Sequence, residues 1–269
     1  MIGDNMAAAA AGGIWQKFRL DGKSAILTGV GPTNGRHFAL ALAEAGANVC
    51  LVARSDRVIG SLAEEVRELG VGALPVQADI SRPEDAERVV TEARNEFGGL
   101  DILFNHVGTA EPRLGKIVDL SLDDFREPLV SNLETTFLMT QQFVRILLQD
   151  GKGGSIINTG STGARTTPPK MAHFSAAKAG LEQFTRCAAA ELAEHGIRVN
   201  CIRLGTFENA GPYLDDIEQG FRKWWLDETP MHRFGRADEA AGAALFLASD
   251  ASSYVTGAVL AVTGGIAVL

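Results

Sequence analysis

The chain has 269 residues, of which 46% are hydrophobic and 22% are charged, a composition typical of a globular protein with one large domain or two small ones. Its formal net charge of −8 argues against binding to nucleic acid or to an anionic membrane, and no apolar run is long enough for a membrane helix. The three separated cysteines, Cys50, Cys187 and Cys201, predict buried free thiols in a reducing compartment, the cytoplasm.

Residues 1–18 are predicted to form a flexible N-terminal tail, because their first part is alanine-rich and lacks the basic start of a signal peptide. From residue 19 to residue 269, apolar strand-like runs alternate with helix-like segments. Strands are predicted at residues 24–28, 48–53, 73–78, 101–104, 155–158, 198–202 and 258–262. The main helices are predicted at about 35–45, 56–69, 82–97, 122–149 and 174–193.

This alternation predicts an α/β protein with a single Rossmann-type domain. Its core would be a doubly wound parallel sheet of about seven strands with helices on both faces. Residues 205–235 are less regular and place Trp224, Trp225, Phe207 and Tyr213 after the sixth predicted strand. We expect this segment either to cover a partly apolar small-molecule substrate or to form surface helices packed on the core.

A glycine-rich turn lies between the first predicted strand and helix, in Thr28-Gly29-Val30-Gly31-Pro32-Thr33-Asn34-Gly35. Such a turn lets a pyrophosphate approach backbone N–H groups at the N-terminus of a helix. A tight turn without a ligand would need the same glycines. The histidines are scattered, and no metal site is predicted.

From about residue 20 to residue 268, the chain resembles the short-chain dehydrogenase/reductase family. Thr28, Gly29 and Gly35 match the family's TGxxxGxG motif, whereas Thr33 takes the place of the middle glycine. The threonine side chain would shift the pyrophosphate, or Gly31 and Pro32 would reshape the loop to compensate. The resemblance implies the following cofactor-binding residues: Gly29, Gly31, Thr33, Asn34, Gly35, Arg54, Ser55, Asp79, Ile80, Asn105, Gly108, Lys178, Gly205 and Thr206.

Two of these segments carry further information. Asn105-His106-Val107-Gly108 stands where the family has NNAG, so that His106 and Val107 depart from the motif. At the end of the second strand, Arg54 follows Ala53 where a carboxylate would bind the ribose of NAD. Because an arginine pairs with a 2′-phosphate, NADP(H) is favoured over NAD(H).

The family's catalytic residues are Asn, Ser, Tyr and Lys, and the resemblance places them at Asn132, Ser161, Phe174 and Lys178. The serine orients a substrate carbonyl, the lysine binds ribose and lowers the tyrosine pKa, and the asparagine holds a water in a proton relay. Phe174 lies four residues before Lys178, on the same helix face. Its phenyl ring has no proton to transfer.

Four explanations of Phe174 remain open. In the first, another group, such as His106, His173 or Tyr213, supplies the proton. In the second, the substrate is an iminium or an activated alkene that needs no strong acid. In the third, the phenylalanine is an engineered substitution of tyrosine, and in the fourth, the cleft serves binding, isomerisation or cyclisation. Further departures at Leu204 and Thr263 favour natural divergence.

The sequence therefore predicts an oxidoreductase that transfers hydride between nicotinamide and a C=O, C=N or activated C=C carbon, with non-standard proton delivery. The alternative is a cofactor-binding pseudoenzyme or a non-redox catalyst. Family resemblance also implies a homodimer or homotetramer.

Overall fold

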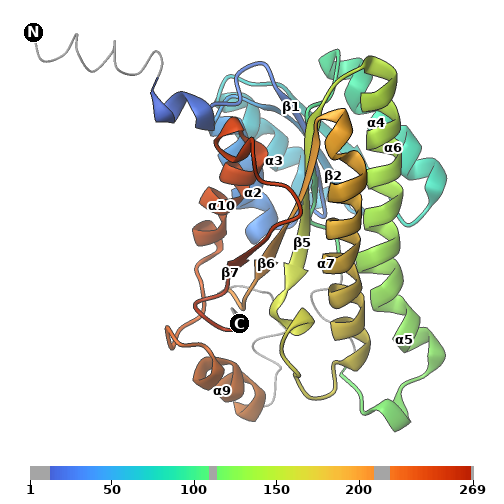
Figure 1. Ribbon diagram of the computed structural model, residues 1–269, viewed down its shortest axis with the longest axis vertical. Helices are drawn as coiled ribbons and strands as arrows, with labels where there is room; N and C mark the ends of the chain where they lie inside the picture. The colour runs from blue at the N-terminus through green and yellow to red at the C-terminus, as the bar shows by residue number, and fades with distance from the viewer. Residues whose placement is uncertain (1–12, 109–113, 209–218, 268–269) are drawn as a thin grey trace, which may run out of the picture.

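The computed structural model describes residues 13–108, 114–208 and 219–267, and for residues 219–221 only the backbone (Figure 1). Seven parallel strands form one sheet in the order β3-β2-β1-β4-β5-β6-β7. The strands are β1 Ser24–Thr28, β2 Asn48–Ala53, β3 Ala73–Gln77, β4 Ile102–Asn105, β5 Gly154–Ser161, β6 Ile197–Leu204 and β7 Val259–Val262. The predicted α/β fold is confirmed, with the strands close to their expected positions.

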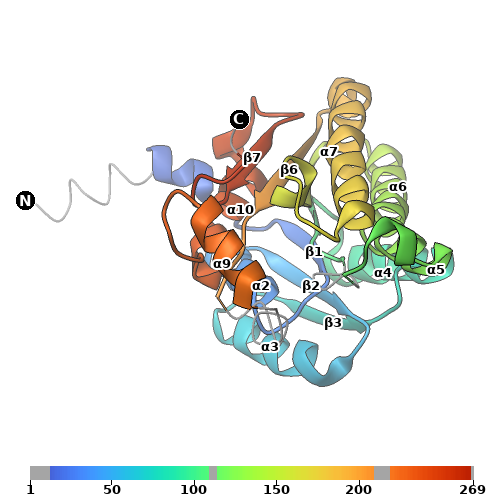
Figure 2. The ribbon, with the colours of Figure 1, turned by 90° about the horizontal axis from the view of Figure 1, so that it is seen from below.

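Helices cover both faces of the sheet (Figures 1 and 2). One face carries α2 Asn34–Glu44, α3 Asp56–Glu68 and α10 Ala241–Ala248, whose apolar side chains share a core with that side of the strands. The opposite face carries α4 Pro83–Phe97, α6 Thr135–Asp150 and α7 Ala172–Leu192, around a second core. Because each central strand contacts helices on both sides, its sequence is a continuous apolar run rather than an alternating one.

The order of the strands reverses between β1 and β4. The chain proceeds outward from β1 through β2 to β3, and then returns to place β4 on the other side of β1. A crevice forms at the carboxyl ends of the strands at such a reversal, and it is the usual ligand site of doubly wound sheets. Gly29 follows β1 at this point with φ of +66°, and a Cβ atom there would lie 2.5 Å from the His106 carbonyl oxygen. Glycine thus allows the segments after β1 and β4 to approach closely.

The helix expected over residues 122–149 is divided into three parts. The α-helix α5 Leu122–Pro128 continues into a π-helical segment, Leu129–Glu134, before α6 begins. Inside the π-helical segment, Asn132 donates from Nδ2 to the Pro128 carbonyl oxygen at 2.9 Å. Segments of π-helix are rare in proteins, and those that occur are often found at functional sites. This one places the fully buried Asn132 beside the crevice.

Other parts of the chain differ from simple expectation. Residues Ile14–Phe18, at the end of the predicted tail, form an exposed 3₁₀ helix, while residues 1–12 lie outside the described part. Cys50 and Cys201 are buried, but the prediction that all three thiols are buried is wrong at Cys187, which is exposed on α7. It lies on the outer surface of that helix, which an alanine-rich sequence does not reveal.

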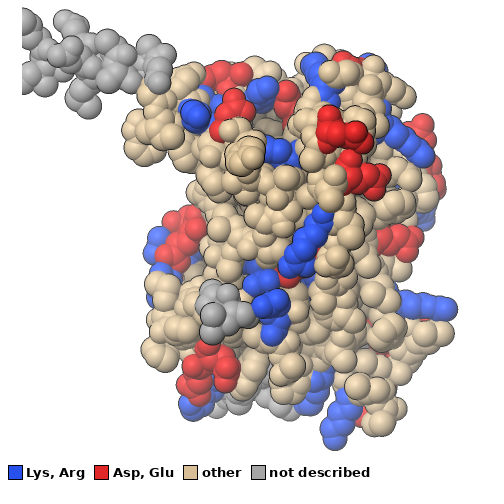
Figure 3. All heavy atoms as spheres, viewed as in Figure 1, with Lys and Arg blue, Asp and Glu red and all other residues tan. Residues whose placement is uncertain are grey.

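On the face seen in Figure 3, basic and acidic side chains are interspersed between wide uncharged areas. Within the described ranges, no helix combines the length and the apolar character needed to cross a membrane.

A buried ion pair connects α7, β6 and the end of the described chain. Arg203 donates from Nε and Nη2 to the two carboxylate oxygens of Glu182, at 2.7 and 2.8 Å, and from Nη1 to the Ala267 carbonyl oxygen at 2.6 Å. The two charged side chains are 8% and 4% exposed. Removing one partner of such a pair is costly, because the remaining charge stays buried.

We predict that Arg203→Met lowers the free energy of unfolding by roughly 3–5 kcal/mol, because the Glu182 carboxylate loses both hydrogen bonds. Arg186→Met is the matched control. Arg186 is 43% exposed and 3.7 Å from the same carboxylate, and its loss should cost less than about 1 kcal/mol. Urea unfolding of the two variants measures the difference, and equal losses would contradict the role of the buried pair.

Candidate functional site

Two adjoining cavities open at the carboxyl ends of the strands. The larger, of about 920 Å³, lies over the ends of β1, β2 and β3, and the smaller, of about 290 Å³, lies between β5, β6 and α7. Gly29, His106, Val107 and Gly108 belong to the walls of both. An elongated ligand could therefore lie across the strand reversal and reach from one cavity into the other.

The glycine-rich turn separates these cavities. Gly31 lines the larger one, whereas Thr33 and Asn34 line the smaller one at the first turn of α2. The Asn34 Oδ1 atom is buried and has no hydrogen-bond partner among the described residues. Gly35 lines neither cavity, because it packs beneath the turn, where its added Cβ would lie 3.2 Å from Val30 Cα.

The predicted adenosine-binding residues Arg54, Ser55, Asp79 and Ile80 all line the larger cavity. Ser55 also caps α3, since its Oγ accepts a hydrogen bond from the Arg57 N–H. The pKa of Asp79 is lowered, mainly because its carboxylate accepts a hydrogen bond from the Ser81 hydroxyl. An anionic carboxylate and a cationic guanidinium thus stand in one wall, and the charge of Arg54 contributes to the lowered pKa of Asp79.

Asn105 has a different position from these residues. Its side chain is buried and lines neither cavity, and Nδ2 donates to Asn158 Oδ1 at 3.0 Å and to Thr140 Oγ1 at 3.3 Å. It therefore holds β4, β5 and α6 together beneath the site.

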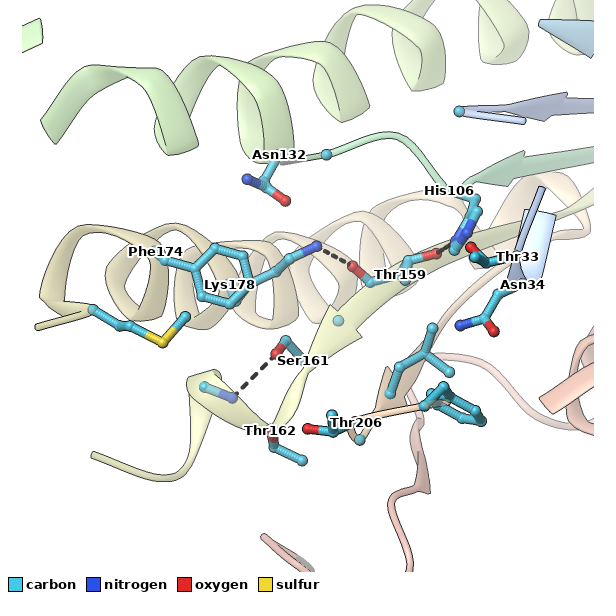
Figure 4. A pocket seen from close by; sticks show the side chains of 18 of the residues that line it. Thr33, Asn34, His106, Asn132, Thr159, Ser161, Thr162, Phe174, Lys178 and Thr206 are labelled. Carbon is cyan, nitrogen blue, oxygen red and sulfur yellow. Dashed lines mark hydrogen bonds between the residues drawn. The ribbon is translucent and has the colours of Figure 1, made fainter. Parts of the chain in front are cut away.

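The four predicted catalytic positions come together in the smaller cavity (Figure 4). Ser161 ends β5, Phe174 and Lys178 are one turn apart on α7, and Asn132 comes from the π-helical segment. Gly205 and Thr206, after β6, lie on the same wall. Close packing requires a glycine at position 108, because a Cβ atom there would overlap Asn132 Oδ1.

Lys178 is the buried cation of this cavity. Its Nζ donates to the Thr159 carbonyl oxygen at 2.7 Å, and the residue is 5% exposed. Burial lowers the lysine pKa to about 8, because loss of hydration destabilises the charged ammonium more than the neutral amine.

His106 lies on the other side of Thr159. Its Nδ1 is 3.1 Å from the Thr159 hydroxyl, and its ring meets Phe38 edge-on at 4.9 Å between centroids. Burial, and secondarily the charge of Lys178, lowers the His106 pKa to about 3. The imidazole is therefore neutral near pH 7.

Phe174 forms an apolar wall where the family has a phenol. The ring is 6% exposed and packs against Gly163, at which an added Cβ would lie 3.3 Å from two ring atoms. Lys178 Nζ lies 5.8 Å from the ring centroid. Ser161 Oγ accepts a hydrogen bond from the Gly163 N–H at 3.2 Å, which leaves its own proton available to a ligand.

The structure separates the other proposed proton donors from this group. His173 is fully buried and lines neither cavity, and neither of its ring nitrogens has a hydrogen-bond partner in the described part of the chain. Tyr213 lies outside the described residues. In the predicted covering segment, Phe207 and Trp225 reach the wall of the smaller cavity, with Trp225 on α9 Gln219–Glu228.

Thr159 is the functional residue that sequence reasoning missed. It is a polar residue in an apolar strand, two positions before Ser161, and this alternation could have indicated that both side chains face the same side. No group of three or more histidine, cysteine, aspartate or glutamate residues suited to a metal ion occurs in the described ranges.

Comparisons with known proteins identify the family. A family model described as "Enoyl-(Acyl carrier protein) reductase" matches residues 33–267. An uncharacterized oxidoreductase of Mycobacterium tuberculosis is 35% identical over 253 residues, covering 94% of this chain and 95% of its own.

Two solved structures are similar in fold and sequence. A 7α-hydroxysteroid dehydrogenase complexed with NADH and 7-oxo glycochenodeoxycholic acid has a TM-score of 0.87 and 31% identity, covering 94% of this chain and 98% of its own. A putative 2-deoxy-D-gluconate 3-dehydrogenase from Agrobacterium tumefaciens with bound NADP has a TM-score of 0.84 and 34% identity, covering 93% and 98%. The chain belongs to the short-chain dehydrogenase/reductase family of oxidoreductases.

We predict that Gly29→Ala destabilises the protein by at least about 1–3 kcal/mol, because an L-residue is strained at positive φ and its methyl group meets the His106 carbonyl. Gly31→Ala is the control in the same turn, since nothing lies within 4 Å of its added Cβ. Thermal unfolding without added cofactor measures both. A similar loss for both variants would show that the close approach at Gly29 is unimportant.

Proposed function

We propose that the protein is an NADP(H)-preferring oxidoreductase that transfers hydride between nicotinamide C4 and a C=O, C=N or activated C=C carbon of a small organic substrate. One observation carries this proposal. The larger cavity, which is large enough for a dinucleotide, adjoins the smaller cavity, whose wall contains Ser161, Lys178 and Asn132. When bound, the cofactor supplies or accepts the hydride, and the protein must position the substrate and manage its proton.

The residues present fit a dinucleotide. Gly29 keeps the turn free of a side chain at the strand reversal, and the N-terminus of α2 offers backbone N–H groups to a pyrophosphate. Asn34 Oδ1, which has no partner among the described residues, would accept a hydrogen bond from a hydroxyl or amide N–H of the cofactor rather than contact the pyrophosphate. Asp79 and Ile80 would hold the adenine end, while Lys178 would donate to the nicotinamide ribose.

Arg54 supports the preference for NADP(H). Its side chain is exposed on the wall of the larger cavity, and its carbonyl oxygen accepts a hydrogen bond from Gln77 Nε2 at 2.9 Å, which fixes the backbone there. A guanidinium at this place would pair with a 2′-phosphate, and the position at the end of β2 where a carboxylate would bind a 2′-hydroxyl is Ala53.

We predict that Arg54→Asp weakens NADPH binding by about 10- to 100-fold, because a charge-assisted hydrogen bond is replaced by repulsion. Binding of NADH should change little or improve. Arg57→Asp, a matched charge change at an exposed residue outside the cavity wall, should leave the preference unaltered. Fluorescence titration with both cofactors measures these effects, and failure of the unmodified protein to bind either would remove the proposed function.

The walls of the smaller cavity favour a partly apolar substrate. Met171, Phe174, Phe207 and Trp225 contribute apolar surface around the polar group formed by Ser161, Thr206 and Lys178. Ser161 would donate a hydrogen bond to the substrate oxygen or nitrogen, because its Oγ already accepts from Gly163. Members of this family typically act as oligomers, and we propose a homodimer or homotetramer.

Phe174 also supports a second candidate function, in which the protein binds cofactor but transfers no hydride. With a phenyl ring in place of the phenol, the cavity keeps its shape and loses its expected acid. Cofactor binding without consumption across ketones, imines and enones would favour this pseudoenzyme.

We predict that Phe174→Tyr raises kcat for ketone reduction by up to about 10²- to 10⁴-fold, the full contribution of a positioned acid, and by less where another group already supplies the proton. Phe207→Tyr adds a hydroxyl elsewhere on the same wall and should give no such gain. The steady-state rate of NADPH oxidation, followed by absorbance at about 340 nm, is measured for both variants. No gain at position 174, with NADPH still bound, would refute the missing phenol as the cause of low activity.

A further inference from the structure

The proposed function leaves the source of the substrate's proton open. Among the described residues that line the smaller cavity, three have ionisable side chains, namely His106, Lys178 and Glu208. His106 is neutral near pH 7 because its pKa is about 3, so it has no surplus proton to donate. Glu208 is an exposed carboxylate within electrostatic reach of Arg233, at the solvent side of the wall.

We propose that the Lys178 ammonium is the general acid that protonates the substrate atom during ketone reduction, directly or through one water. This inference rests on the proposed function and deepens it. Lys178 is one helical turn from Phe174, faces the cavity that also contains Ser161, and is held by its hydrogen bond to the Thr159 carbonyl.

The hydrogen bond to Thr159 makes proton loss possible without loss of position. An ammonium has three donors, of which the Thr159 carbonyl uses one at 2.7 Å. After giving up a proton, the neutral amine still has a donor for the same carbonyl. Lys178 can thus change its charge while its Nζ remains beside the substrate.

The surroundings of Lys178 contain few compensating charges. Burial lowers its pKa to about 8, with a smaller opposing effect of Cys201 on β6. The Cys201 pKa is raised to about 12 by burial, so this thiol is neutral at pH 7. Glu182, on α7, is engaged by Arg203. Among the described residues, the other groups near Lys178 are uncharged, namely the Thr159 carbonyl on β5, neutral His106 after β4, the Asn132 amide and the Phe174 ring.

The proton and electron balance is complete with the proposed cofactor. As hydride bonds to the carbonyl carbon, the π electrons of the C=O bond move to oxygen, which takes one proton from Lys178. The products are an alcohol, oxidised cofactor and a neutral lysine amine, which regains a proton from water. A phenol at position 174 would be a competing acid, whereas the phenyl ring offers none.

The first test is the pH dependence of kcat for a ketone. A general acid works in its protonated form, so kcat should be constant at low pH and fall about tenfold per unit above an apparent pKa near 8. Lys178→Arg keeps the charge but has a pKa above about 12, and it should lower kcat by roughly 10²- to 10⁴-fold and remove this limb. Lys17→Arg, at an exposed residue far from the cavity, is the control and should behave as the unmodified protein.

A substrate that carries its own charge separates proton transfer from cofactor binding. Reduction of an N-alkyl iminium consumes no proton. At saturating NADPH, the Lys178→Arg variant should therefore reduce it at about the same rate as the unmodified protein, within a few-fold. Equal losses for ketone and iminium would overturn the inference and assign Lys178 a purely positioning role.

A second readout needs no turnover. In protein labelled with ¹³C at lysine Cε, the resonance missing from Lys178→Arg identifies Lys178, and its shift should titrate with a midpoint near 8 in the absence of cofactor. A midpoint above about 10, the value of an ordinary lysine, would overturn the inference. If the unmodified protein does not bind NADPH, the proposed function itself fails. If it binds NADPH and reduces the iminium but not the ketone, only the role of Lys178 is overturned.

Discussion

The hydrogen bond from Lys178 Nζ to the Thr159 carbonyl oxygen connects the chemistry of the site to the fold. It joins α7 to the end of β5 inside a region from which water is largely excluded. The Thr159 hydroxyl is also within hydrogen-bond distance of His106, at the end of β4. One residue near the end of β5 therefore contacts both a cation on α7 and an imidazole after β4.

Most departures from the family pattern lie in the wall of the smaller cavity. Thr33, His106, Val107, Phe174 and Leu204 line it, whereas Thr263 does not. Because the lysine charge and burial keep His106 neutral, and because Phe174 carries no ionisable group, Lys178 is left as the buried cation of the described wall. The larger cavity, in contrast, keeps Gly29, the strand reversal and Asp79, which the family resemblance assigns to cofactor binding.

Much of this arrangement could be predicted from local sequence. Buried parallel strands are apolar throughout, so their positions were visible, and glycine at position 29 is required by a backbone torsion and a close approach. The spacing of Phe174 and Lys178 places them on one helix face without knowledge of any other segment. The π-helical segment could not be foreseen, because helical periodicity does not distinguish it from α-helix; within it, the Asn132 side chain donates to the Pro128 carbonyl oxygen.

The amino-acid sequence by itself determined the doubly wound sheet and the glycine turn, because these follow from periodicity and local backbone geometry. Its resemblance to the family indicated which residues meet at the strand ends. Only the tertiary structure decided that Asn105 supports the site from beneath, that Thr159 links Lys178 to His106, and that Cys187 is exposed. It also decided the protonation of the two basic residues. The pKa of a buried group depends on how much water is excluded by residues that are distant in the sequence, and a local sequence pattern does not show this.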